Sequence, residues 1–268
     1  MVADEIRHDV AADVTQPVLI CLLGSFRVLK VGANVPVRSG GKTAILLSSL
    51  ALRDRHRASR QSLLETLWPD TDSARSAHAL NSLIYALRQL LGDALAGAPP
   101  VVYTAGAYEL NEGAGVGVDV AHFDTSATTA ERHLREGDIP AAVRSWCRAA
   151  AIYKGDVYAV GEDIHAIVQR ERLRGLYLSV LAHLADQCFR ESNYSEALGY
   201  ALRLLSHDPC REDGHRMAMR CYVRLGERAQ ALRQYRLCAK ILASEFDAQP
   251  EALTGVLFEQ VRTNPGAV

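Results

Sequence analysis

The chain has 268 residues, 49% of them hydrophobic and 23% charged, so a sizeable core can form and a chain that is disordered throughout is excluded. A formal net charge of −1 excludes a protein that is strongly basic or strongly acidic as a whole. The charge is uneven, however: residues 18–110 hold ten Lys and Arg against six Asp and Glu, so this part alone favours an anionic partner.

The first 16 residues are acidic and contain no apolar stretch of the kind found in signal peptides, so we expect a disordered tail there. The chain also has no run of about 18 apolar residues, the length a membrane-spanning helix needs. We therefore expect a cytoplasmic protein with no membrane partner.

Residues 18–110 show the pattern of a sheet followed by three helices and a hairpin. Residues 18–37 are rich in β-branched types and are interrupted at Gly32-Ala33-Asn34, which predicts two or more short strands around tight turns. Residues 40–54 have helical periodicity. A second helix is predicted within 59–70, with Ser59 as its N-cap and Trp68-Pro69 at its end.

A third helix is predicted over 73–91, capped by Asp72 or Ser73 and ended by Gly92. Residues 100–112 then read as a β-hairpin that turns at Ala105-Gly106-Ala107. This order of elements describes a winged helix, a fold whose third helix enters the DNA major groove while the hairpin is available at the backbone or the minor groove.

The third helix has two different faces at 100° per residue. Leu80, Leu83, Ile84 and Leu87 lie on one face and predict contact with the core. The opposite face carries hydrogen-bonding groups that can read base edges. We expect base contacts from His78, Asn81, Ser82 and Tyr85, phosphate contacts from Arg75, Arg88, Arg57 and Arg60, and further contacts from Tyr103 and Thr104 on the hairpin.

From about Phe123 the pattern is helical to the end of the chain. Residues 194–209 and 228–243 align with an offset of 34, which places Ala197-Leu198 on Ala231-Leu232 and Asn193 on Glu227. This period, with small residues where helices cross, is typical of tetratricopeptide repeats, which stack into a solenoid. The predicted fold class is thus mainly α: an α+β winged helix followed by an all-α tetratricopeptide-like domain.

No pattern of an enzyme, a cofactor site or a metal site stands out. The segment "PVRSGGKT" ends like a phosphate-binding loop, but Pro36 stands where that motif requires its first glycine. The histidines and cysteines show no zinc spacing, and no nucleophile has a local base signature. We therefore predict a protein that is not an enzyme and needs no cofactor.

The motifs "LLGSFRVL", "GGKTAILLSSLAL", "SRQSLLETLWPD", "ALNSLIYALRQLLG", "VVYTAGAYEL", "VDVAHFD" and "YRLCAKILASEFDAQP" occur in an order that is specific as a set. In this order the chain, from about 18 to 262, resembles the Streptomyces antibiotic regulatory protein (SARP) type. Such proteins join an OmpR-type winged helix to a bacterial transcriptional activator domain.

The resemblance implies a DNA-binding domain over 17–118 and an activator domain over 119–268, whose first helix lies near 123–136. It implies a transcriptional regulator, usually an activator, that recognises promoter direct repeats as a dimer and contacts RNA polymerase. Arg88 matches a position where the recognition helix usually has an arginine.

A second hypothesis remains open. The polar face of the third helix holds only Arg75 and Arg88 as full cations, although phosphate neutralisation supplies most non-specific DNA affinity. The alternative is a tetratricopeptide scaffold for protein interactions, whose winged helix binds DNA weakly or no longer binds it.

Overall fold

The computed structural model describes residues 16–158 and 164–268. The predicted tail, residues 1–16, lies outside this part except for Gln16. The chain forms two compact units, which we call the N-terminal unit (Met1–Thr129 and Ala151–Arg174) and the C-terminal unit (Ala130–Ala150 and Gly175–Val268).

The N-terminal unit opens with a four-stranded sheet in the order β3-β2-β1-β7. β1 pairs antiparallel with β2, with Ile20 opposite Val28, and parallel with β7, with Leu19 opposite Gly117. The prediction of short strands within 18–37 is confirmed. The turn lies at Val31 and Gly32, which both have positive φ. The strands are β1 (Val18–Cys21), β2 (Arg27–Lys30), β3 (Ala33–Val35) and β7 (Val116–Val118).

Three helices follow the first strands, as predicted. They are α2 (Lys42–Ala51), α3 (Arg60–Leu67) and α4 (Ser73–Leu91). The hydroxyl of Ser59 caps α3 by accepting a hydrogen bond from the N–H of Ser62 (3.1 Å). Lys42, in the segment that ends like a phosphate-binding loop, donates to the carbonyl of Leu67 and lies 5.7 Å from the ring centroid of Trp68. This lysine therefore joins α2 to the end of α3.

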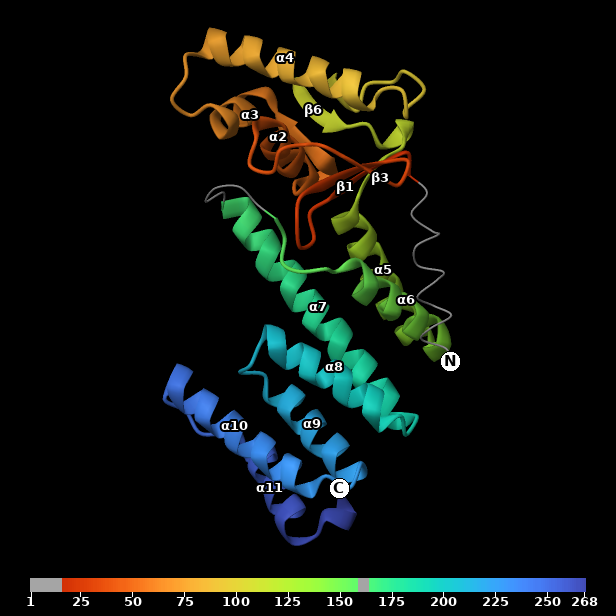
Figure 1. Cartoon of the computed structure of the whole chain (residues 1–268), viewed down its shortest axis with the longest axis vertical. Helices are drawn as coiled ribbons and strands as arrows, with labels where there is room; N and C mark the ends of the chain where they lie inside the picture. The colour runs from red at the N-terminus through yellow and green to blue at the C-terminus, as the bar shows by residue number, and fades with distance from the viewer. Residues whose placement is uncertain (1–15, 159–163) are drawn as a thin grey trace. The chain divides into compact units, whose positions relative to one another are not determined.

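A second, three-stranded sheet has the order β4-β6-β5. Its hairpin confirms the prediction for 100–112 and turns at Ala105 and Gly106, both with positive φ, whereas Ala107 is already in strand conformation. Figure 1 shows β6 beside the C-terminal part of α4, within the same unit. The strands are β4 (Arg57–Ser59), β5 (Val101–Thr104) and β6 (Ala107–Leu110), and short 3-10 turns cover Asp54–His56 and Glu112–Ala114.

The N-terminal unit also includes a segment that is distant in the sequence, around residues 154–158. Val157 forms an isolated bridge with Leu23, and the N–H of Tyr158 donates to the carbonyl of Leu22 (2.7 Å). Gly24 has a φ of 94°, and a Cβ there would come within 3.0 Å of the carbonyl of Lys154. A glycine is needed at this position because the two backbones approach so closely.

The helices that follow are α5 (Asp119–Glu136), α6 (Ile139–Ile152), α7 (Ile164–Arg190), α8 (Tyr194–His207), α9 (Glu212–Arg224), α10 (Arg228–Phe246) and α11 (Ala252–Thr263), with a final 3-10 turn at Pro265–Ala267. The expected start of the helical region near Phe123 was four residues too late. The side chain of Asp119, the first residue of α5, accepts hydrogen bonds from the backbone of Leu22 and Leu23, and this contact between distant segments has no local sequence signal.

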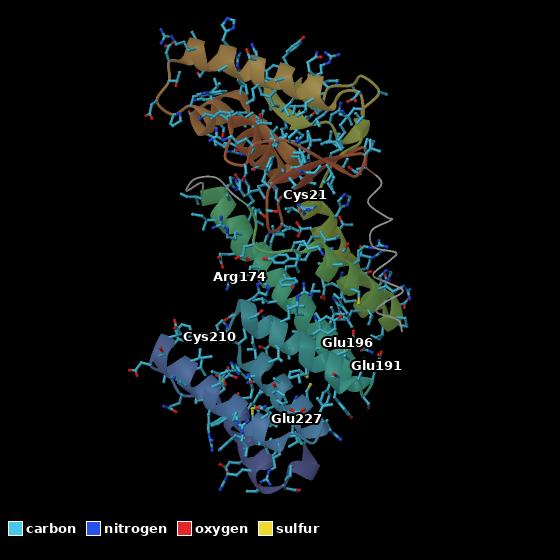
Figure 2. The ribbon with its side chains drawn as sticks, in the orientation of Figure 1. Cys21, Arg174, Glu191, Glu196, Cys210 and Glu227 are labelled. Atoms are coloured by element: carbon cyan, nitrogen blue, oxygen red, sulfur yellow. The ribbon has the colours of Figure 1, made fainter. Side chains whose placement is uncertain are left out.

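The C-terminal unit has the predicted repeat. α8 and α10 begin at Tyr194 and Arg228, 34 positions apart, directly after Asn193 and Glu227. Ala197 and Ala231 are both fully buried, as small residues at a helix crossing should be. Near the turn between α7 and α8, where Figure 2 labels Glu191 and Glu196, the amide of Asn193 donates to the Glu196 carboxylate (2.7 Å).

α9, α10 and α11 share a core at the end of the C-terminal unit. The rings of Tyr235 and Phe258 stack there with centroids 4.0 Å apart. The apolar side chains around these rings pack α11 against the last helix pair, so α11 covers the end of the repeat. Its fully or nearly fully buried members are Met219, Ala231, Leu257 and Val261.

Candidate nucleic-acid interface

α4 has one apolar face and one polar face. It begins after Asp72, whose carboxylate accepts a hydrogen bond from the N–H of Ala74 (3.2 Å), and it ends at Gly92. Capping by aspartate stabilises the first turn, which fixes where the helix starts. The apolar face anchors the helix to the rest of the unit. Its fully or nearly fully buried side chains are Leu80, Leu87 and Leu91.

The opposite face of α4 is open to solvent. With 19 residues the helix is about 28 Å long, and an α-helix fits the width of the major groove. Tyr85 is a large aromatic residue with 65% of its surface exposed. The structure thus places all six predicted contact residues of this helix on one exposed face. They are Arg75, His78, Asn81, Ser82, Tyr85 and Arg88.

Two side chains of this exposed face, those of Ser82 and Arg88, donate hydrogen bonds to nearby backbone carbonyls. The hydroxyl of Ser82 donates to the carbonyl of His78 (3.1 Å), and the Arg88 guanidinium donates to the carbonyl of Gly97 (3.4 Å). Arg88 therefore also holds the loop that follows α4. Within residues 16–158 and 164–268, the side chains of Arg75 and Asn81 make no hydrogen bond or ion pair, so their donors remain available to a partner.

The hairpin of β5 and β6 forms the wing. Tyr103 is 56% exposed and its ring lies 4.7 Å, centroid to centroid, from that of Tyr108, which is buried. Burial raises the pKa of the Tyr108 phenol, while the nearby Arg60 lowers it. The predicted wing residues Tyr103 and Thr104 are both exposed, next to the turn.

The two arginines predicted from the joint between α2 and α3 have different surroundings. The guanidinium of Arg57 donates to the carbonyls of Thr104 (3.0 Å) and Ala105 (3.4 Å), so β4 holds the turn of the wing. Arg60, the first residue of α3, is half-buried, and its Nε is a buried donor without a partner in the described part of the chain.

A shallow hollow of about 260 Å³ lies between the exposed face of α4 and the hairpin of β5 and β6. Asn81, Tyr85 and Arg88 line it from α4, and Pro99 and Tyr108 line it from the hairpin side. Three of the predicted α4 residues and the wing thus meet at the C-terminal half of the helix. Arg75 and His78 lie in the N-terminal half.

Sequence reasoning missed Pro99 and Tyr108 as parts of this surface. Tyr108 lies within the predicted hairpin, but only the pairing of β4 with β6, which sets Ala58 opposite Tyr108, shows which way the strand faces. The role of Arg57 in holding the wing was also missed. This role depends on the same pairing of β4 with β6, which joins residues far apart in the sequence and so cannot be predicted from a local pattern.

Residues 118–262 match the family model of the bacterial transcriptional activator domain. The chain belongs to this family. The predicted resemblance to the SARP type is thereby confirmed.

Curated relatives support the same assignment. Regulatory protein AfsR of Streptomyces coelicolor is 27% identical over 229 residues, which cover 85% of this chain and 22% of that protein. AfsR of Streptomyces griseus is 23% identical over 229 residues, covering 85% of this chain and 23% of that protein. The chain therefore spans less than a quarter of the length of these relatives.

A solved structure has the same fold as this activator-domain chain. Mycobacterium tuberculosis EmbR, solved in complex with a low-affinity phosphopeptide, superposes with a TM-score of 0.73 at 19% identity, covering 92% of this chain and 65% of that chain. This likeness confirms the predicted fold class, a small strand-containing part followed by tetratricopeptide-like helices.

A membrane-spanning helix and a metal site are not found in the described residues. Among residues 16–158 and 164–268, no helix has the length and apolar character needed to cross a membrane. In the same described residues, no group of three or more His, Cys, Asp or Glu is arranged to hold a metal ion.

Proposed function

We propose that this chain is a sequence-specific DNA-binding transcriptional regulator that reads the major groove with α4 and activates transcription. The observation that carries the proposal is the exposed face of α4, where donors and acceptors suited to base edges lie opposite a buried leucine face. Because the buried face fixes the helix, its angle to a groove is set before DNA binds.

The contacts follow from the chemistry of each side chain. Asn81 can pair with adenine, and Ser82, His78 and Tyr85 with base edges or nearby phosphates. Arg75 contacts phosphate from the N-terminal half of α4, and Arg88 contacts it from the other half. Tyr103 and Thr104 face the backbone or the minor groove from the wing.

The joint between α2 and α3 adds positioning contacts. Arg60, the half-buried first residue of α3, adds positive charge near the phosphate backbone. Arg57 acts on DNA through the wing turn, which it holds by two hydrogen bonds, and adds positive charge near the backbone. Together these residues orient the unit on DNA, whereas α4 supplies the specificity.

The larger assembly follows the family. We propose that residues 17–118 serve as the DNA-binding domain and 119–268 as the activator domain. Two copies bind promoter direct repeats, and the activator domain contacts RNA polymerase. A chain with this role works in the cytoplasm, without a cofactor or a catalytic step.

The proposal can be tested with DNA taken from upstream of the chain's own gene. Fluorescence anisotropy at several salt concentrations measures the affinity and its salt dependence, with scrambled DNA of the same length as the reference. If Arg75 contacts one phosphate, Arg75→Ala weakens binding to both DNAs and lowers the slope of log affinity against log salt by about 0.9. A matched control is Arg236→Ala, which removes an exposed arginine of α10.

An unchanged slope in Arg75→Ala would show that this docking of α4 is wrong. Micromolar binding that does not distinguish the promoter from scrambled DNA would favour the second candidate, the tetratricopeptide scaffold. The specific observation that favours the scaffold is the small number of cations on α4, since only Arg75 and Arg88 are full charges on its exposed face.

A further inference from the structure

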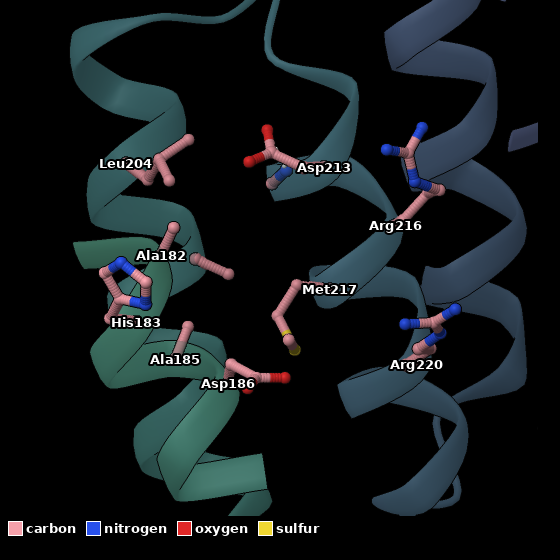
Figure 3. Close-up of a pocket in the computed structure, with 11 residues that line it drawn as sticks. Ala182, His183, Ala185, Asp186, Leu204, Asp213, Arg216, Met217 and Arg220 are labelled. Carbon is pink, nitrogen blue, oxygen red and sulfur yellow. Dashed lines mark hydrogen bonds between the residues drawn. The ribbon is translucent and has the colours of Figure 1, made fainter. Parts of the chain in front are cut away.

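The C-terminal unit contains a cavity of about 340 Å³ between α7, α8 and α9, which lies at the lower end of the size range of small-molecule sites. Its volume suits a molecule of modest size. Figure 3 shows Ala182 and Ala185 from α7, Leu204 from α8 and Met217 from α9 around its middle. Small alanine side chains leave the space open, and Met217 is flexible enough to adapt to an occupant.

Apolar side chains line the middle of the cavity, and titratable side chains complete the lining. Asp213 and Asp186 lie at different ends in Figure 3, and Arg216 and Arg220 line the α9 side. An occupant would thus place an apolar body against the alanines and Met217, and a polar group near the rim.

Four of the five titratable side chains in the lining already have a partner. Asp186 pairs with Arg190 (2.8 Å), and Asp213 pairs with Arg211. The Arg216 guanidinium donates to Glu251 (3.0 Å) and to the hydroxyl of Thr254 (2.9 Å). His183 lies 3.3 Å from the Glu131 carboxylate and stacks on the ring of Trp146.

Arg220 differs from the other four. It is exposed, and within the described residues its guanidinium makes no hydrogen bond or ion pair. Among the titratable side chains of the lining, Arg220 is therefore the one without an ion-pair partner in the described part of the chain. An anionic group on the occupant completes the set, whereas a cation there would be repelled.

We infer that this cavity binds an amphipathic organic anion, a small molecule with an apolar body and one carboxylate, whose carboxylate pairs with Arg220. The site lies wholly within the C-terminal unit and does not depend on DNA binding by α4. By contacting α7, α8 and α9 together, the ligand stabilises their packing.

The test uses the full chain and octanoate as the probe, with octylamine as a probe of equal length and opposite charge. The chain has three methionines, Met1, Met217 and Met219, so a protein labelled at the methionine methyl groups gives a simple NMR spectrum. Met217 lines the cavity, whereas Met219 is fully buried in the neighbouring core. Met217→Leu identifies the reporting signal by its loss.

Octanoate is expected to shift the Met217 signal in a saturable way, and octylamine is expected to leave it in place. Arg220→Gln raises the half-saturating octanoate concentration about tenfold, because a hydrogen bond to a charged group is lost. Arg236→Gln removes an exposed arginine of α10 and leaves the titration unchanged. Ala182→Phe fills the cavity and abolishes the shift, while its circular dichroism spectrum shows that the helices remain.

Three results would overturn the inference. One is a Met217 signal that octanoate does not move. Another is an equal response to octylamine, which would show that the carboxylate is not recognised. The third is an equal loss of octanoate affinity in Arg220→Gln and Arg236→Gln, which would show that only the total charge of the protein matters.

Discussion

At the scale of single residues, Asp119 joins segments that are far apart in the sequence. It is 7% exposed, and its carboxylate accepts hydrogen bonds from the backbone N–H of Leu22 (2.8 and 2.9 Å) and of Leu23 (2.9 Å). Burial nevertheless raises its pKa to about 6, against the lowering effect of these bonds and of nearby Arg27. Burial, together with the nearby charge of Asp119, raises the pKa of the Cys21 thiol, which Figure 2 labels, to about 11.

The raised pKa of Asp119 predicts a pH dependence of stability. A carboxyl group with a higher pKa in the folded state binds its proton more tightly there, so its contribution is fully present below about pH 4. This contribution is lost as the pH rises through about 6. The loss is at most about 3 kcal/mol, because a pKa difference of one corresponds to about 1.4 kcal/mol.

Unfolding in urea between pH 4 and 7 measures this effect. The chain has two tryptophans, and a Trp146→Phe background leaves Trp68 to report on the N-terminal unit. Asp119→Asn is expected to remove the fall in the free energy of unfolding with rising pH, whereas Asp54→Asn, at an exposed site, keeps it. The same fall in Asp119→Asn as in the parent would contradict the assignment.

At the scale of the elements, the segment around Tyr158 fastens the start of α2. The Tyr158 hydroxyl accepts a hydrogen bond from the N–H of Gly40 (2.7 Å) and one from the Ser39 hydroxyl (3.1 Å). Its ring lies 5.5 Å, centroid to centroid, from that of Phe26. The hydroxyl and the ring thus connect this segment to two parts of the N-terminal unit.

Tyr158→Phe keeps the ring and removes only the hydroxyl. We expect the N-terminal unit to lose about 1 kcal/mol of unfolding free energy, since the N–H of Gly40 loses its acceptor. Urea unfolding followed by Trp68 fluorescence measures the change. Tyr235→Phe, in the C-terminal unit, is the control, and a loss no larger than in this control would show that the hydroxyl contributes nothing.

The elements that could be predicted have signals in their own sequence, such as capping residues and apolar periodicity, whereas the elements that were missed have none. The bounds of α4 were predicted because Asp72 and Gly92 mark its ends and a leucine pattern fills it. β4 and β7 were missed because each has three residues and a distant partner, as when Leu19 pairs with Gly117. The candidate face of α4 was predictable for the same reason as the helix, whereas the hold of Arg57 on the wing depends on β4.

At the scale of the whole molecule, the boundary between the two compact units differs from the start of the matched family domain. The match to the activator-domain family begins at residue 118, yet the N-terminal unit also takes in Ala151–Arg174. Val157 and Tyr158, within the family match, bond to the backbone of Leu22 and Leu23 beside β1. DNA-binding experiments should therefore use the whole chain, because a chain cut at 118 lacks these contacts.

The central claim is that α4 reads base pairs, and Asn81 tests it most directly because its exposed amide has no partner in the described structure. The measurement compares the affinity of the full chain and of Asn81→Ala for a promoter site and for a panel of its single-base variants. We expect Asn81→Ala to relax the preference at one base pair by about 1–3 kcal/mol and to keep it elsewhere. An unchanged preference at every position would contradict the placement of α4 in the major groove.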